Sequence, residues 1–301
     1  EPQTLVLGLH DQLAGFLRSR GMDVEQIDLN VEFVNHSVTG PGNVERLMES
    51  RGWRAVLAGP ATSPAEIRKA AGRIAEKAAA IPSVRRAMFS ALSGHLGLQP
   101  PSTRIDELLR WVAAPHDLYE RFLDSMLGPR LERGAPLVAG ISVASSSQLG
   151  PALKVARSLS ASGCRHVTLG GPWARAAREM LPHWSDIFDH VDSIGTGDGE
   201  GILLDLVKAV REDRDPAGIP GLSVRRAGAV VDGGDASRLQ LGDLPDPDFS
   251  DLDLGRYENR WLPVRSRRAC PWGRCLFCHH VLKGEAPEDP LPPSAIVDRM
   301  E

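Results

Sequence analysis

Residues 137–149 have the sequence LVAGISVASSSQL, an apolar run followed by a short polar turn. The run at 137–143 predicts a buried strand. The segment after the turn predicts a helix, because apolar side chains recur along one face of it: Leu149, Leu153, Ala156 and Leu159. A strand, a turn and a helix in this order make one β-α unit.

The same alternation continues on both sides of this unit and predicts a parallel, Rossmann-like α/β sheet. Strands are expected at 4–9, 24–30, 54–59, 166–169 and 191–194. Helices are expected at 11–20, 173–180 and 200–212. Residues 222–226 and 229–231 predict a small hairpin.

The sequence predicts a helical insert, a linker and a second domain. Residues 63–132 are rich in Ala, Arg, Glu and Leu at helical spacing, with prolines that start or end helices, and predict a helical insert of three or four helices. The Pro- and Asp-rich stretch that starts at 242 predicts a linker, 242–259, after an α/β domain that spans 1–241. Residues 260–301 then open a second domain, with a strand at 261–268 and the start of a helix at 296.

The composition is that of a globular protein, with 42% hydrophobic and 25% charged residues, and excludes disorder. A net charge of −4 gives no electrostatic case for a nucleic-acid or membrane partner. No apolar run approaches the roughly 18 residues of a membrane span, and no signal peptide is recognisable. Three of the four cysteines lie within nine residues, which favours a metal or redox site in a cytoplasmic protein over a disulfide framework.

The cysteine cluster, Cys270-Pro-Trp-Gly-Arg-Cys275-Leu-Phe-Cys278, offers three thiolates on a short loop after a strand. Three soft ligands this close suit a transition metal or an iron–sulfur cluster. Four arginines surround them and would stabilise thiolates, unless they only form a solvated basic face: Arg265, Arg267, Arg268 and Arg274.

The residues alone leave four interpretations of the cysteines open. The first is a [4Fe–4S] cluster held by three cysteines, with one iron open to another ligand. The second is zinc with His279 or His280 as fourth ligand, although a second pair of ligands is missing. The third is covalent haem, since Cys275-Leu-Phe-Cys278-His279 matches C-x-x-C-H. The fourth is a dithiol or buried reduced cysteines without a metal.

The spacing Cys270-(x4)-Cys275-(x2)-Cys278, with Phe277 before the last cysteine, resembles the cluster loop of radical S-adenosylmethionine enzymes. The family's usual first gap is three residues, so this chain departs from it by one. The resemblance implies that the three cysteines ligate a [4Fe–4S] cluster whose fourth iron is chelated by S-adenosylmethionine. One electron from the cluster would then cleave the sulfonium and give a 5′-deoxyadenosyl radical.

The α/β unit before this loop resembles the cobalamin-binding domain that precedes many radical S-adenosylmethionine cores. Ser147-Gln148-Leu149 matches that family's S-x-L element, Gly170-Gly171 its GG element, and Gly197-Asp198-Gly199-Glu200 its G-E-G-E loop with one change. The implied cobalamin-binding residues are Ser145, Ser146, Ser147, Gln148, Leu149, Gly170, Gly171, Pro172, Gly195, Gly197, Gly199 and Glu200.

One family element is missing. The D-x-H-x-x-G motif that supplies a histidine to cobalt is absent, because residues 10–15 are HDQLAG. A nicotinamide cofactor fits poorly as well, since Glu200 stands where G-x-G-x-x-G requires its third glycine.

Together the two resemblances imply a cobalamin-dependent radical S-adenosylmethionine enzyme, C-terminally truncated, that transfers a methyl group to an unactivated carbon of a small-molecule or peptide substrate. They also imply that residues 260–301 start a partial (β/α) barrel, and that a flavodoxin- or ferredoxin-type protein is the electron donor. Two alternatives stay open: a radical enzyme that modifies a peptide or natural product without methyl transfer, and a zinc-stabilised binding module without catalysis.

Overall fold

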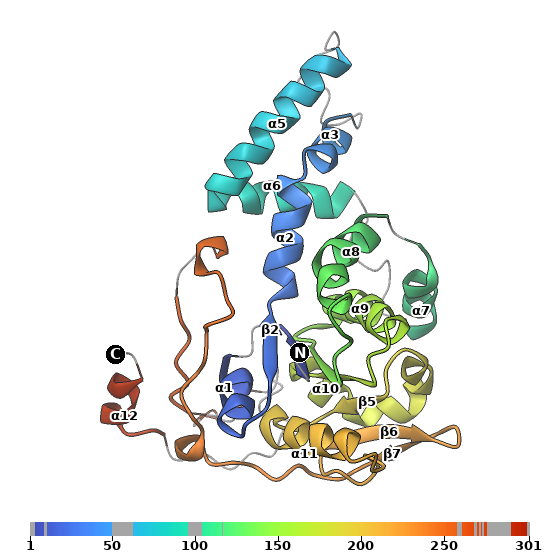
Figure 1. The fold of residues 1–301 in the computed structure, drawn as a ribbon, viewed down its shortest axis with the longest axis vertical. Helices are drawn as coiled ribbons and strands as arrows, with labels where there is room; N and C mark the ends of the chain where they lie inside the picture. Colours follow the sequence, from blue (N-terminus) through green and yellow to red (C-terminus); the bar gives the residue numbers. More distant parts are fainter. Residues whose placement is uncertain are drawn as a thin grey trace.

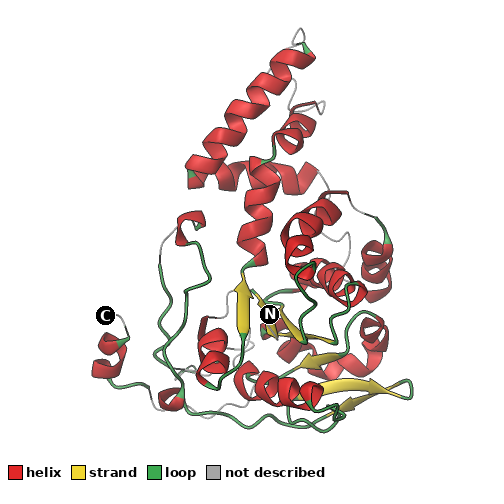
Figure 2. Ribbon diagram, viewed as in Figure 1, coloured by secondary structure: helices red, strands yellow, loops and turns green. Residues whose placement is uncertain are grey.

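The computed structural model describes residues 4–8, 11–49, 63–95, 104–115, 117–257, 261–267, 270, 272, 274–275 and 290–299. The expected strand at 54–59 lies outside these residues. The described chain has a mixed α/β fold in which helices flank a sheet of mainly parallel strands (Figure 2).

The described residues form one seven-stranded sheet in the order β2-β1-β3-β4-β5-β6-β7. The strands are β1 Thr4–Leu7, β2 Val24–Ile27, β3 Val138–Ser142, β4 His166–Gly170, β5 Ser193–Gly195, β6 Leu222–Arg226 and β7 Ala229–Asp232. Strands β1 to β5 pair in parallel, and β6 and β7 add an antiparallel hairpin at one edge. The predicted parallel sheet and hairpin are confirmed. The strand order reverses between β1 and β3, which in open α/β sheets marks the place where ligands bind.

Helices cover both faces of the sheet (Figure 1). On one face lie α1 (Asp11–Ser19) and α11 (Gly199–Arg211), and their apolar side chains pack with Val6 and Val138. The other face is covered by α7 (Ile105–Ala113), α8 (Asp117–Leu131), α9 (Leu149–Ala161) and α10 (Pro172–Ala177), followed by the irregular η2 (Arg178–Asp189). The four side chains predicted for the buried face of α9 are all buried, so that helix is confirmed.

A separate helical group extends away from the sheet (Figure 1). It consists of α2 (Leu29–Thr39), α3 (Pro41–Glu49), α5 (Pro64–Ala80) and α6 (Pro82–His95), which share their own apolar core. The sequence predicted helices over 63–132, and α5 to α8 confirm them. It predicted a strand over 24–30, but β2 ends at Ile27 because the Asp28 carboxylate accepts from Asn30 N and Val31 N and caps α2.

The segment 245–257, called the strap below, runs over α1 and the edge strand β2. Gln12 Nε2 donates to Pro245 O at 2.6 Å, and Arg18 pairs with Asp248 at 2.5 Å and also with Asp251. Asp251 in turn accepts from Gln26 N of β2 at 2.7 Å. The predicted linker therefore lies along α1, and its carboxylate occupies a donor of the sheet edge that would otherwise be open to another strand.

The chain on both sides of the cysteine loop meets at one place. Leu291 N donates to Ser266 O at 2.9 Å, and Leu291 is buried in the apolar core formed with α1 and α11. The strand predicted at 261–268 is wrong for the described residues 261–267, which have no regular structure. Helix α12 (Pro293–Asp298) follows and confirms a helix near 296.

Among the described residues, no helix has both the length and the apolar character that crossing a bilayer requires.

Candidate functional site

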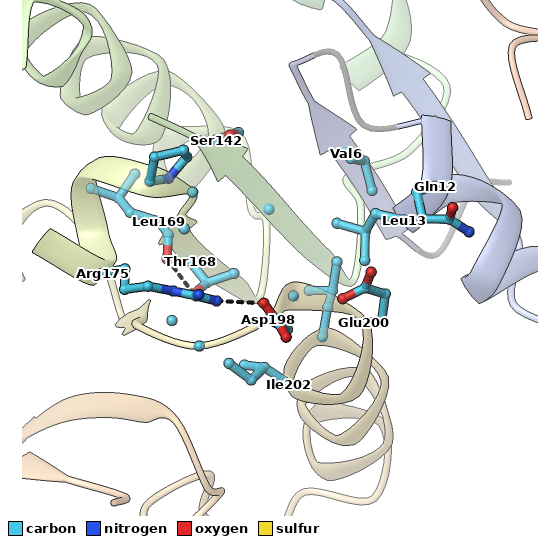
Figure 3. A pocket seen from close by; sticks show the side chains of 18 of the residues that line it. Val6, Gln12, Leu13, Ser142, Thr168, Leu169, Arg175, Asp198, Glu200 and Ile202 are labelled. Atoms are coloured by element: carbon cyan, nitrogen blue, oxygen red, sulfur yellow. Dashed lines mark hydrogen bonds and ion pairs between the residues drawn. The ribbon is translucent and has the colours of Figure 1, made fainter. Parts of the chain in front are cut away.

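A cavity of about 460 Å³ opens at the carboxyl ends of the parallel strands, on the face covered by α1 and α11 (Figure 3). Strands β1, β3, β4 and β5 all contribute to it. Its lining residues are Val6, Gln12, Leu13, Gly140, Ile141, Ser142, Thr168, Leu169, Gly170, Gly171, Pro172, Arg175, Gly195, Gly197, Asp198, Gly199, Glu200, Ile202, Leu203, Arg238, Arg265 and Arg267. The structure therefore brings the GG loop and the G-D-G-E loop together at one cavity.

Gly170 ends β4 and Gly171 follows it, and the two glycines have different structural roles. A Cβ at Gly170 would meet only Gly195 O, at 4.0 Å, so this glycine leaves open space. Gly171 has a φ of +90°, and a Cβ there would lie 2.7 Å from Ser142 Oγ and 2.8 Å from Val143 O. Gly170 thus makes room in the cavity, whereas Gly171 allows the turn that brings α10 onto the sheet.

The loop after β5 brings charged side chains to the cavity. Asp198 pairs with Arg175 at 2.5 Å, and Arg238 Nε lies 3.5 Å from its other oxygen. Glu200, in the first turn of α11, is buried. The 195–200 loop is therefore held by ion pairs across the mouth of the cavity.

Two polar features of the wall were not predicted from the sequence. Gln12 is 7% exposed, and its Oε1 has no hydrogen-bond partner among the described residues although Nε2 is bound to Pro245 O. Arg265 and Arg267 reach the cavity from the segment that leads to Cys270. The sequence had placed these arginines only beside the cysteines.

The residues of the 145–149 turn are not part of this cavity. Ser147 and Gln148 line a second, smaller cavity of about 190 Å³ against α2 and α8 on the opposite face of the sheet. Gln148 Oε1 accepts from Ala144 N at 2.7 Å, and its Nε2 donates to Asn30 Oδ1 at 3.1 Å. The Ser145 and Ser147 hydroxyls are 2.8 Å apart, and Leu149 is buried in the core. Ser146 opens the same short turn and is exposed.

Two of the three clustered cysteines are described. Cys270 is exposed and Cys275 is half-buried, so neither belongs to an apolar core. Cys278 and Phe277 lie outside the described residues. Within the described residues no group of three or more His, Cys, Asp or Glu side chains could hold a metal ion.

Cys164, the fourth cysteine, differs from the clustered cysteines. It is buried, and burial raises the pKa of its thiol to about 11. A thiol of this kind is protonated at neutral pH and neither binds metal nor acts as a nucleophile.

The cavity offers features that a large, partly polar ligand would use. Gly170 leaves space that any side chain would occupy, and the unpartnered Gln12 Oε1 offers an acceptor for an N–H or O–H group. The apolar wall of Val6, Leu13 and Leu203 suits a planar ring. A corrinoid carries a nucleotide with an aromatic ring and a phosphodiester, so the residues present fit this nucleotide part of the group.

No family model matches the chain. It is 25% identical over 206 residues to an uncharacterized methyltransferase from Pyrococcus horikoshii, an alignment that covers 64% of this chain and 44% of that protein. The chain therefore spans less than half the length of this curated relative.

Two solved structures of the radical S-adenosylmethionine methyltransferase TsrM from Kitasatospora setae are similar at 15% identity. The one with tryptophan and a S-adenosylmethionine analogue aligns with 77% of this chain and 30% of that chain, with a TM-score of 0.39. The one with cobalamin and a [4Fe–4S] cluster aligns with 82% of this chain and 31% of that chain, with a TM-score of 0.37.

Proposed function

We propose that the chain is part of a cobalamin-dependent radical S-adenosylmethionine methyltransferase. Residues 1–241 would form the cobalamin-binding unit, 242–259 the connection, and 260–301 the start of the radical domain. The Pyrococcus horikoshii relative is named as a methyltransferase, which supports methyl transfer as the reaction.

One observation carries the proposal: the segment that leads to the cysteines lines the same cavity as the glycine loops. Arg265 and Arg267 belong to the wall, and Cys270 follows Arg267 by three residues. A chain of three residues spans at most about 11 Å between Cα atoms. A cluster on Cys270 would therefore lie close to a ligand that fills the cavity.

The described residues also fix the base of the cysteine loop. The bond between Leu291 N and Ser266 O joins the two ends of the loop, and Arg299 donates to Leu244 O at 3.0 Å. The two ends of the segment that carries the cysteines are thus anchored beside the sheet. This arrangement favours an enzyme over a binding module whose metal only stabilises a loop.

Residues of this chain can be assigned to the cluster and to the corrinoid. Cys270, Cys275 and Cys278 would hold a [4Fe–4S] cluster, with Phe277 beside it, and S-adenosylmethionine would occupy the open iron. The cavity lined by Gly170, Gly171, Pro172, Gly195, Gly197, Gly199 and Glu200 would hold the corrinoid, with residues 145–149 outside its wall. When bound, the cluster supplies an electron for cleavage of the sulfonium, and the corrinoid supplies the methyl group.

The chain's own residues position these groups. The ion pairs of Asp198 with Arg175 and Arg238 hold the 195–200 loop at the cavity. The guanidinium groups of Arg265 and Arg267 offer donors to a phosphodiester at the mouth of the cavity.

Iron content of cysteine variants tests the ligand assignment. Cys270→Ala, Cys275→Ala and Cys278→Ala should each lose most of the iron that the unchanged chain takes up on anaerobic reconstitution. Cys164→Ala is the matched control and should keep it, because Cys164 is buried in the α/β core. Unchanged iron in any of the three loop variants would contradict the assignment, and zinc in place of iron would favour the binding module.

A further inference from the structure

The smaller cavity, of about 190 Å³, lies at the place where the strand order of the sheet reverses. Leu7 and Gly8 at the end of β1 line it, together with Ile141 and Ser142 at the end of β3. Ligands of open α/β sheets bind at such a reversal, outside the carboxyl ends of the strands. The proposed function uses the larger cavity on the other face and leaves this one without a role.

Aromatic side chains from three helices form a wall of the smaller cavity. Phe33 of α2 stacks on Tyr119 of α8, with ring centroids 4.7 Å apart and an angle of 7° between the planes. Phe122 of α8 and Phe89 of α6 meet the Phe33 ring edge-on, at centroid distances of 5.0 Å and 6.0 Å. Aromatic rings attract one another in both of these arrangements, so a further ring that enters the cavity finds favourable contacts.

The two cavities differ in charge. Among the described residues that line the smaller cavity, no side chain is charged. The larger cavity is lined by four arginines and two carboxylates, namely Arg175, Arg238, Arg265, Arg267, Asp198 and Glu200. The phosphodiester of a corrinoid therefore suits the larger cavity, whereas the smaller one suits a neutral ring, because a charge would lose its hydration there without gaining a partner.

Neutral polar groups lie at the solvent-exposed part of the smaller cavity. Asn30 and Ser147 line it and are exposed. Gln148 Nε2 donates to Asn30 Oδ1 at 3.1 Å, which orients the Asn30 amide and leaves its NH2 group as a donor. A ligand whose ring lies against Phe33 could therefore present a neutral polar substituent, such as an amide or a hydroxyl, to Asn30 and Ser147.

The volume limits the ligand group to one ring. An apolar cavity of about 150 Å³ that is lined by Leu, Ile and Phe side chains stays dry and binds benzene. The smaller cavity, at about 190 Å³, therefore holds a benzene-sized ring with a few further atoms. A corrin macrocycle is too large for it.

We propose that the smaller cavity binds an aromatic ring of the methyl-accepting substrate and anchors this substrate beside the corrinoid. The inference rests on the proposed function, in which a corrinoid occupies the larger cavity. Ile141 and Ser142 line both cavities, so the end of β3 is their common wall and the two bound groups lie close together. The substrate class is thus a molecule or peptide side chain with one neutral aromatic ring and a polar substituent.

Binding of three small probes to the 301-residue chain tests the inference. Phenylacetamide carries an aromatic ring and a neutral amide, cyclohexylacetamide a saturated ring, and phenylacetate a charge. Ligand-observed NMR should give a dissociation constant for phenylacetamide of about 1 mM, as expected for a ligand of this size. The other two probes should bind about three- to tenfold more weakly, because one lacks the aromatic contacts and the other loses the hydration of its charge.

Substitutions on α9 and α2 locate the bound probe. Ala152 of α9 is 6% exposed and lines the cavity, so the side chain of Ala152→Leu extends into it and should weaken phenylacetamide binding about tenfold or more. Ala161→Leu is the matched control and should bind the probe as the unchanged chain does, because Ala161 is exposed at the end of the same helix. Phe33→Leu removes the stacked ring and should remove the preference for phenylacetamide over cyclohexylacetamide. Thermal unfolding identifies any variant that is not folded.

Hydroxocobalamin separates the inference from the proposed function. Phenylacetamide should bind equally well to the chain saturated with hydroxocobalamin, and Ala152→Leu should keep its affinity for the corrinoid. Displacement of the probe by hydroxocobalamin, equal binding of phenylacetamide and cyclohexylacetamide, or unweakened binding to Ala152→Leu would overturn the inference and leave the proposed function in place. Failure of the unchanged chain to bind hydroxocobalamin would overturn the proposed function, and with it the assignment of the ring to a methyl acceptor.

Discussion

Substitution of Gly170 by leucine should block the cavity without disturbing the fold. The φ of Gly170 lies outside the left-handed region, so its backbone does not require glycine. A Cβ there would have one neighbour, Gly195 O at 4.0 Å, and a longer side chain would extend into open space. Gly170→Leu therefore changes the cavity while the strand can stay as it is.

The size of the effect follows from the volumes. Removal of one leucine side chain from a rigid core leaves a cavity on the order of 150 Å³, so the new side chain would fill about a third of the 460 Å³ cavity. An extra group in a packed site costs about 1–3 kcal/mol. A ligand that fills the cavity should therefore bind about 5- to 150-fold more weakly.

Absorbance or calorimetric titration with hydroxocobalamin measures this loss. Gly201→Ala is a matched control, because Gly201 lies in α11 and a Cβ there would have no neighbour within 4 Å. Without ligand, both variants should unfold within about 2–4 °C of the unchanged chain, the shift that 1 kcal/mol produces in a protein of this size. Unweakened binding of cobalamin by Gly170→Leu would refute the placement of the corrinoid.

Three further predictions concern stability. Gly171→Ala should lower the unfolding free energy by about 1–3 kcal/mol, because the φ of +90° suits only glycine and the new Cβ would lie 2.7 Å from Ser142 Oγ; a denaturant titration measures this. Arg18→Met should speed hydrogen exchange of the strap amides near Asp248, because the Arg18 guanidinium pairs with two strap carboxylates. Unchanged exchange would show that other contacts hold the strap. Since burial lowers the pKa of His166, the unfolded chain binds the proton more readily, and stability should fall as the pH drops below about 6.5. His166→Gln should flatten the dependence of Tm on pH between 7 and 5, and an equally steep dependence would contradict this.

Much of the fold could be predicted because its signals are local. The apolar runs of β3 and β4 and the one-sided leucines of α9 are contained within single segments. Helix α2 was missed for a local reason as well: Asp28 is compatible with the end of a strand, and only its hydrogen bonds to Asn30 N and Val31 N show that it caps a helix. Residues 261–267 have no regular secondary structure, and their conformation depends on contacts with residues far along the chain, such as the bond from Leu291 N to Ser266 O. The local sequence therefore gives no signal that this segment is not a strand.

The part of the cavity that glycines line could be predicted from the sequence. The loops at Gly170 and Gly195 follow adjacent parallel strands, so their convergence follows from the predicted sheet. Thr168 could have been found from its position two residues before Gly170, which places both on one face of β4. Gln12 gave no such signal, because its role depends on the strap that crosses α1 more than 230 residues later.

The 145–149 turn lies apart from the cavity that the glycine loops line. Its serines and Gln148 follow a strand, as a ligand loop would. Gln148, however, binds the backbone of its own turn and Asn30 of α2, so its amide is already occupied. The direction of a side chain in such a turn is set by its neighbours and not by the spacing of the motif.

Metal and corrinoid content, measured on one sample of the chain reconstituted anaerobically with iron, sulfide and hydroxocobalamin, tests whether the chain holds both proposed cofactors. We expect about four irons and one corrinoid per chain, with the iron lost and the corrinoid kept when Cys275 is replaced by alanine. One zinc per chain without a brown chromophore, or a complete cluster without any bound corrinoid, would contradict it.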